Sequence, residues 1–88
     1  MRLTIYSKPG CHLCDEMKAV VKGVIASTPA ASLDEVDISA DPDLLERYGL
    51  DIPVLEIEGK KIAKFRISAE ALTKAIASRQ STVGSDQS

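Results

Sequence analysis

Several residue types are scarce in this chain, and each scarcity excludes a class of protein. There is no tryptophan, one histidine and two cysteines, and only 3% of the residues are aromatic. Two cysteines form at most one disulfide, which excludes a small scaffold stapled by several bridges. No apolar run reaches 18 residues, so the sequence predicts no membrane span. The net charge is only −2, and nothing in it indicates a nucleic-acid partner.

What remains is the composition of a small globular domain. The 88 residues are 44% hydrophobic and 27% charged, which fits one domain. We expect the domain to occupy residues 1–79 and the polar residues 80–88 to form a disordered tail. The apolar part of the first five residues is too short for a signal peptide. We therefore expect a cytoplasmic protein. We also expect a monomer.

The residues that carry chemistry gather in one stretch, from Tyr6 to Met17. It contains both cysteines, Cys11 and Cys14, and the single histidine, His12. Apolar residues run into Pro9-Gly10, and a helical pattern starts directly afterwards, which predicts a strand, a sharp turn and a helix. Two thiols at this spacing can close a short disulfide or hold a soft metal ion.

The hydrophobic periodicity predicts seven elements in the order β-α-β-α-β-β-α. Their expected ranges are 2–6, 12–27, 33–38, 42–48, 54–58, 61–65 and 69–79. The β-α-β start implies parallel strands, and the turn at Glu58-Gly59-Lys60 implies an antiparallel hairpin. The fold class is therefore α/β, with a four-stranded mixed sheet flanked by three helices.

The second helix has the clearest boundary signals. Asp41 is a good N-cap, and Pro42 suits the first helical position. Gly49 fits the left-handed conformation that often ends a helix. The buried side of this helix is predicted to consist of Leu44, Leu45 and Tyr48. In the third helix, Ser68 is the expected cap.

The position of Cys11 favours its thiolate form. Unpaired N–H groups at a helix N-terminus stabilise negative charge, and Lys8 adds positive potential. Cys14 lies one turn further along, on the same side of the helix, and should be less exposed and less ionised. Two readings of His12 stay open: an imidazolium that stabilises the Cys11 thiolate, or a solvent-exposed spacer.

Two further features have both a structural and a functional reading. Pro53 suits the first position of a strand, but a cis Ile52-Pro53 bond would leave the Ile52 backbone free to pair with an extended substrate. The basic residues of the hairpin region protect an edge strand or attract an acidic peptide or glutathione. They are Lys60, Lys61, Lys64 and Arg66.

Taken together, the stretch Tyr6–Cys14, the Ile52-Pro53 pair and the order of elements resemble the glutaredoxin-like proteins of the thioredoxin superfamily, over residues 1–78. The resemblance implies a thioredoxin-like fold and dithiol–disulfide exchange. Cys11 would then be the nucleophile and Cys14 the resolving cysteine. Lys8 would be the basic residue beside the site, Ile52 would pair with the substrate, and Pro53 would be a cis-proline.

The sequence departs from the glutaredoxin pattern at two places. His12-Leu13 lies between the cysteines, where glutaredoxins usually carry Pro-Tyr. Phe65–Ser68 replaces the Gly-Gly and acidic residue that hold the γ-glutamyl group of glutathione. We expect no bound cofactor and only weak glutathione-dependent activity. The expected partners are a disulfide-containing protein or small thiol substrate, with glutathione or a reductase as electron donor.

Two alternatives use the same residues differently. In the first, the cysteine pair binds a metal ion or an iron–sulfur cluster without catalysis, although two thiols leave a tetrahedral zinc site incomplete. In the second, the domain keeps a thioredoxin-like shape and only binds a partner.

Overall fold

A computed structural model describes residues 1–80 and contains the predicted elements in the predicted order. Their boundaries differ from the expected ones by at most two residues, and a short 3₁₀ helix, η1, is added. The elements are β1 (Arg2–Ser7), α1 (His12–Ile25), β2 (Ser32–Asp37), η1 (Ile38–Ala40), α2 (Pro42–Tyr48), β3 (Val54–Ile57), β4 (Lys60–Lys64) and α3 (Ala69–Gln80). The expected tail at 81–88 lies outside the described residues. Within residues 1–80, no helix is long and apolar enough to cross a membrane.

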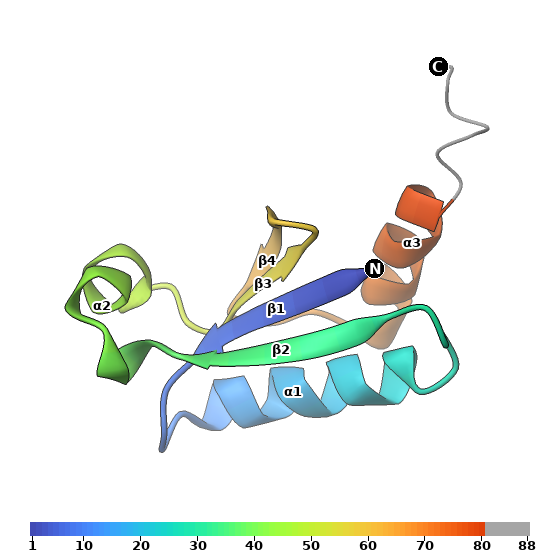
Figure 1. The fold of residues 1–88 in the computed structure, drawn as a ribbon. Helices are drawn as coiled ribbons and strands as arrows, with labels where there is room; N and C mark the ends of the chain where they lie inside the picture. Colours follow the sequence, from blue (N-terminus) through green and yellow to red (C-terminus); the bar gives the residue numbers. More distant parts are fainter. Residues whose placement is uncertain (81–88) are drawn as a thin grey trace.

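The four strands form one mixed sheet in the order β2-β1-β3-β4 (Figure 1). As predicted, β1 and β2 are parallel, because α1 carries the chain back across the sheet. β3 runs antiparallel to both β1 and β4. The β3–β4 turn places Glu58 at φ 51° and Gly59 at φ 82°. Two consecutive positive φ values match the tight hairpin turn whose twist suits neighbouring strands.

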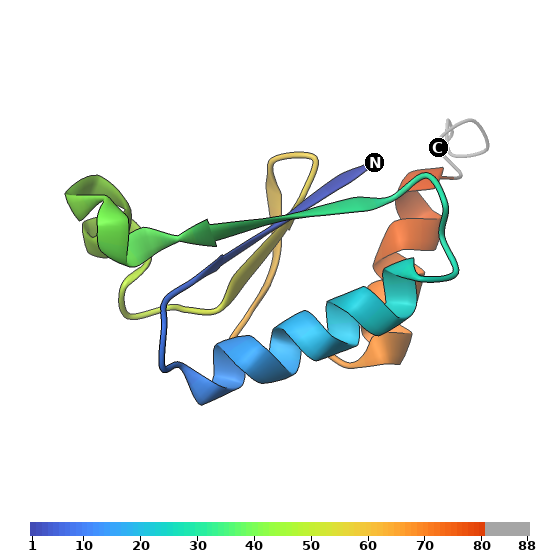
Figure 2. The ribbon, with the colours of Figure 1, turned by 60° about the horizontal axis from the view of Figure 1, so that its bottom comes forward.

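The core lies between one face of the sheet and the two long helices, α1 and α3 (Figure 2). Each strand contributes alternate residues, and each helix contributes residues three or four positions apart. The buried set is Leu3, Ile5, Met17, Val21, Leu55, Ile57, Leu72 and Ile76. Because these side chains fix α1 against the sheet, they also fix the helix N-terminus that follows the Cys11 turn.

The prediction that Leu44, Leu45 and Tyr48 form a buried side of α2 is wrong in part. None of the α2 residues is fully buried, and Leu45 is 40% exposed. The reason is position: this two-turn helix lies at the end of the sheet rather than across it (Figure 1). Its contact with the sheet includes the ring of Tyr48, which stacks on Tyr6.

The predicted left-handed conformation of Gly49 is also wrong. Its φ is −56°, and its N–H donates a hydrogen bond to the carbonyl oxygen of Leu45 at 2.8 Å. The helical conformation therefore continues through this residue. An added Cβ would collide with the Leu45 carbonyl oxygen, so small size rather than a positive φ explains the glycine.

Candidate redox site

The turn that carries Cys11 is short and sharply bent. β1 ends at Ser7, Gly10 has a φ of +80°, and α1 begins at His12. A left-handed φ is strained for residues with a Cβ, which explains the glycine here. Cys11 itself is extended, with φ −92°, and is the N-cap of α1. The predicted strand, turn and helix are thus present. Cys11 lies one position before the first helical residue, His12.

The sulfur of Cys11 faces the open end of the helix. It accepts a hydrogen bond from the backbone N–H of Cys14 at 3.2 Å, and the Cys11 side chain is only half-buried. In the structure the two cysteines form a disulfide, with their Cα atoms 5.2 Å apart. When that bond is reduced, the same N–H donor and the helix dipole stabilise a thiolate at Cys11.

Cys14 has very different surroundings. Its side chain is fully buried, on the helix stripe that continues through Met17 and Val21. The expectation that Cys14 is the less exposed cysteine is therefore confirmed. An apolar environment disfavours the charged form of a thiol, and the two cysteines therefore lie in different surroundings although they are three residues apart.

The second part of the site is the loop before β3. The Ile52-Pro53 peptide bond is cis, as the family resemblance implied. Tyr6 pairs with Val54 across the sheet, which places Pro53 beside the end of β1 where the Cys11 turn starts. Among residues 1–80, the Ile52 backbone N–H and carbonyl have no hydrogen-bond partner. Its backbone groups therefore keep their hydrogen-bonding capacity free in this part of the chain.

Two predicted substrate-binding residues lie on the surface of this end of the molecule. The His12 side chain is 86% exposed, and its Nε2 lies 2.9 Å from a carboxylate oxygen of Glu16. The imidazole thus pairs along the helix surface rather than with Cys11. Lys8 is exposed in the turn. The binding roles of Lys8, His12, Ile52 and Pro53 stay predictions.

A cluster that sequence reasoning missed lies on the sheet face opposite the core. The rings of Tyr6 and Tyr48 stack with centroids 4.4 Å apart. Their hydroxyls donate to the two carboxylate oxygens of Glu56, each at 3.4 Å. Burial, followed by the negative charge of Glu56, raises the pKa of Tyr6. The cluster fastens the end of α2, and so the start of the loop that leads to Pro53, to the sheet.

Strand alternation provides a signal for part of this cluster. Thr4 pairs with Glu56 and Tyr6 with Val54, so Tyr6 and Glu56 project from the same face of the sheet. The position of Tyr48 has no such signal, because the sequence does not determine how the neighbouring loop places α2 against the sheet.

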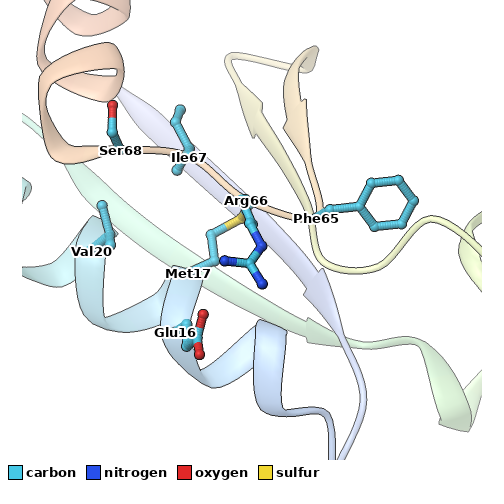
Figure 3. A pocket seen from close by; sticks show the side chains of 7 residues that line it. All are labelled: Glu16, Met17, Val20, Phe65, Arg66, Ile67 and Ser68. Atoms are coloured by element: carbon cyan, nitrogen blue, oxygen red, sulfur yellow. The ribbon is translucent and has the colours of Figure 1, made fainter.

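Beside the cysteines, a cavity of about 380 Å³ opens between α1 and the segment that connects β4 to α3. Figure 3 shows its lining: Glu16, Met17, Val20, Phe65, Arg66, Ile67 and Ser68. The sequence singled out the connecting segment as a departure from glutaredoxins. The half contributed by α1 was not predicted, because its residues read as ordinary core and surface positions.

A tetrahedral zinc site would need more ligands than the cysteine pair. Within residues 1–80, no group of three or more His, Cys, Asp or Glu side chains is arranged to hold a metal ion.

The family model of the glutaredoxin-like domain (DUF836) matches residues 2–77. This chain belongs to the glutaredoxin-like domain family. Its match covers both cysteines, the cis-proline and all of the core elements up to α3.

Solved structures place this glutaredoxin-like chain among thioredoxin folds. The X-ray structure of protein XcR50 from X. campestris is 30% identical, covering 86% of this chain and 96% of that one, with a TM-score of 0.67. Protein Ne2328 from Nitrosomonas europaea is 25% identical over 84% of this chain and 88% of its own length, with a TM-score of 0.70. Desulfothioredoxin from Desulfovibrio vulgaris Hildenborough, at 23% identity, covers 88% of this chain and 79% of that one and shares the fold with a TM-score of 0.67.

The glutaredoxin-like chain thus has a thioredoxin-like fold, with a four-stranded mixed sheet and three helices. Its close cysteine pair at the N-terminus of α1 supports a redox role.

Proposed function

We propose that the protein is a thiol–disulfide oxidoreductase that uses a dithiol mechanism. Cys11 is the nucleophile and Cys14 the resolving thiol. The observation that carries the proposal is the contrast between a half-exposed Cys11 sulfur that accepts a backbone N–H and a fully buried Cys14.

The reaction consists of two exchanges. The Cys11 thiolate attacks one sulfur of a substrate disulfide, which forms a mixed disulfide and releases the first substrate thiolate. Cys14 then loses its proton and attacks the Cys11 sulfur, which forms the Cys11–Cys14 disulfide and releases the second substrate thiolate. Both released thiolates take up protons, so the substrate gains two electrons and two protons. The protein is left oxidised.

The spacing of the cysteines supports the second exchange. Their Cα atoms are 5.2 Å apart, within the range that disulfides occupy without movement of the backbone. A mixed disulfide on Cys11 would therefore be resolved by Cys14 within the same helix turn.

A donor thiol has to reduce the Cys11–Cys14 disulfide again before the next turnover. We propose two equivalents of glutathione or a protein reductase as this donor, with glutathione the weaker. In the structure the Ser68 hydroxyl caps α3 by accepting from the N–H of Ala71 at 3.0 Å. The segment that would have to hold the γ-glutamyl group thus offers a capped helix start in place of the glycine pair of glutaredoxins.

The proposal is tested with two single variants. Cys11→Ser should lower disulfide reduction on the order of a thousandfold or more, because the covalent step loses its nucleophile. Cys14→Ser should still react once and accumulate the mixed disulfide, which intact mass spectrometry detects. Full turnover by Cys11→Ser, or a mixed disulfide carried on Cys14, would show that the roles are assigned wrongly.

A further inference from the structure

The cavity beside the redox site begins one helical turn from the resolving cysteine. Cys14 and Met17 lie on the same buried stripe of α1, and Met17 forms part of the cavity lining. Three residues of helix rise about 4.5 Å. A group bound in this cavity is therefore within reach of a substrate whose disulfide is being exchanged at Cys11 and Cys14.

Much of the lining is apolar, and two of its polar side chains already have partners. Met17, Val20 and Ile67 supply the apolar part. The Glu16 carboxylate is paired with His12 at 2.9 Å, and the Ser68 hydroxyl accepts from the N–H of Ala71. Small polar ligands usually need several convergent polar groups. Because these two groups are already paired, the cavity is poorly suited to a small polar ligand.

Arg66 is the exception on the rim. Its guanidinium has no ion pair within residues 1–80. Figure 3 shows its side chain extending from the connecting segment toward α1, on the side of Glu16, whereas the ring of Phe65 points away. The rim therefore presents a cation to anything that enters from solvent.

The wall of the cavity is also tied to the cis-proline loop. Phe65 has a φ of +71°, and the N–H of Arg66 donates to the carbonyl of Lys64 at 2.8 Å, which is a γ-turn of the strained kind. The N–H of Phe65 donates to the carbonyl of Pro53 at 2.8 Å. Strained residues that persist near a site are held there by their surroundings, and here the strained residue directly precedes Arg66 and Ile67 in the cavity wall.

We propose that this cavity binds one large apolar side chain of a polypeptide substrate, close in sequence to the substrate's reactive cysteine. Arg66 receives a carboxylate that follows the apolar residue. The proposal rests on the oxidoreductase function above and gives its substrate class: a protein or peptide disulfide rather than a small polar disulfide. A cavity of about 380 Å³ is large enough for a leucine or phenylalanine side chain.

A set of peptides tests the apolar part. Each peptide carries one cysteine, joined by a disulfide to a coloured aromatic thiol, and one leucine at a position up to three residues from that cysteine, followed by a glutamate. In the reference peptide, called the glycine peptide, glycine replaces the leucine. One leucine position should lower KM about tenfold relative to the glycine peptide, as expected for burying one aliphatic side chain. Equal KM values at every position would overturn the proposal.

Two matched variants locate the effect. Val20→Phe fills the cavity and should abolish the leucine preference while leaving reduction of bis(2-hydroxyethyl) disulfide unchanged. Val24→Phe is the control, because Val24 is equally half-buried one turn further along α1 and lines a different cavity. If both variants lose the preference, or neither does, the side chain does not bind in this cavity.

The Arg66 contact has its own test. Replacing the peptide's glutamate by glutamine should raise KM about two- to fivefold in the wild type, the size of an exposed ion pair. The same replacement should have no effect in Arg66→Gln. An equal effect in both proteins would show that Arg66 does not receive the carboxylate.

A binding measurement separates this inference from the proposed function. A cysteine-free copy of the best leucine peptide is added to oxidised wild-type protein, and side-chain methyl signals are followed by NMR. Shifts at the methyl groups of Met17 and Val20, without shifts at Val24, support the cavity even if the protein reduces no disulfide. Unchanged Met17 and Val20 signals at millimolar peptide would overturn the cavity proposal and leave the redox function untouched.

Discussion

Cys11 and Cys14 lie in the same turn of chain, yet their surroundings are opposite. Cys11 precedes α1 and is half-buried, and its sulfur accepts an N–H from the helix. Cys14 is fully buried among core residues. The two residues are only three positions apart, but Cys11 is the N-cap of α1 whereas Cys14 lies on the face of the helix that packs against the core. The comparison teaches that two residues of the same type, three positions apart, differ here in burial and in the backbone donors that face their sulfurs.

The largest change in the difference between Cys11 and Cys14 is expected from Met17→Ala. Met17 is 2% exposed and follows Cys14 on the same stripe. The truncation should lower the free energy of unfolding by about 2–5 kcal/mol, measured by urea denaturation. It should also expose Cys14, so that Cys14 in the reduced protein is alkylated faster.

The control for this variant is Val24→Ala, which lies on the same helix and is packed against the same core. It should lower stability without changing the alkylation rate of Cys14. If Met17→Ala leaves Cys14 as slow as in the wild type, burial by Met17 is not what protects that thiol.

A smaller effect is expected from Tyr48→Leu, which changes the loop beside Cys11 and leaves the surroundings of Cys14 as they are. The variant removes the stack on Tyr6 and one hydroxyl contact with Glu56. Stability should fall by about 1 kcal/mol, and KM for a disulfide substrate should rise because the loop leading to Pro53 is held less firmly. Tyr48→Phe keeps the ring and should stay close to the wild type in both measurements. A loss of equal size in Tyr48→Phe would assign the effect to the hydroxyl.

The smallest effect is expected far from both cysteines, at Glu35 on β2. Hydrogen bonds from Lys22 and Lys18 lower the pKa of this carboxyl, with Lys22 the larger cause. A lowered pKa in the folded state stabilises the protein above the ordinary glutamate pKa, and this contribution is lost as the pH falls through the folded-state pKa.

Glu35→Gln should therefore lower stability at neutral pH by less than about 1 kcal/mol, since the pair is exposed. The difference from the wild type should vanish in strongly acidic buffer, as followed by thermal unfolding at both pH values. The alkylation rates of the two cysteines should not change. A deficit that persists in acid would show that the ionised carboxylate is not its cause.

Much of the fold follows from local patterns in the sequence. Leu3 and Ile5 alternate along β1, Met17 and Val21 repeat along α1, and Asp41 and Ser68 cap their helices as predicted. These features depend on near neighbours in the chain. Where a helix lies relative to a sheet does not, which is why Leu45 of α2 was assigned to the core and is exposed.

The candidate site also has parts that depend on near neighbours in the chain and parts that depend on how distant segments pack. The Cys11 turn is local and was predicted from its residues, whereas the cis form of Pro53 came only from the family resemblance. The cavity is formed by two segments about fifty residues apart, Glu16–Val20 and Phe65–Ser68. The sequence marks Phe65–Ser68 only as a departure from glutaredoxins and gives no signal for Glu16–Val20, and only the packing of the connecting segment against α1 brings the two together.

The difference between the two cysteines is tested most directly by competitive alkylation. The protein is fully reduced and treated at neutral pH with a limiting amount of iodoacetamide, and peptide mass spectrometry then counts the label on each cysteine. The account predicts at least about tenfold faster labelling of Cys11, because the thiolate is the reactive form and only Cys11 has exposure and a backbone donor. Equal labelling, or faster labelling of Cys14, would contradict it.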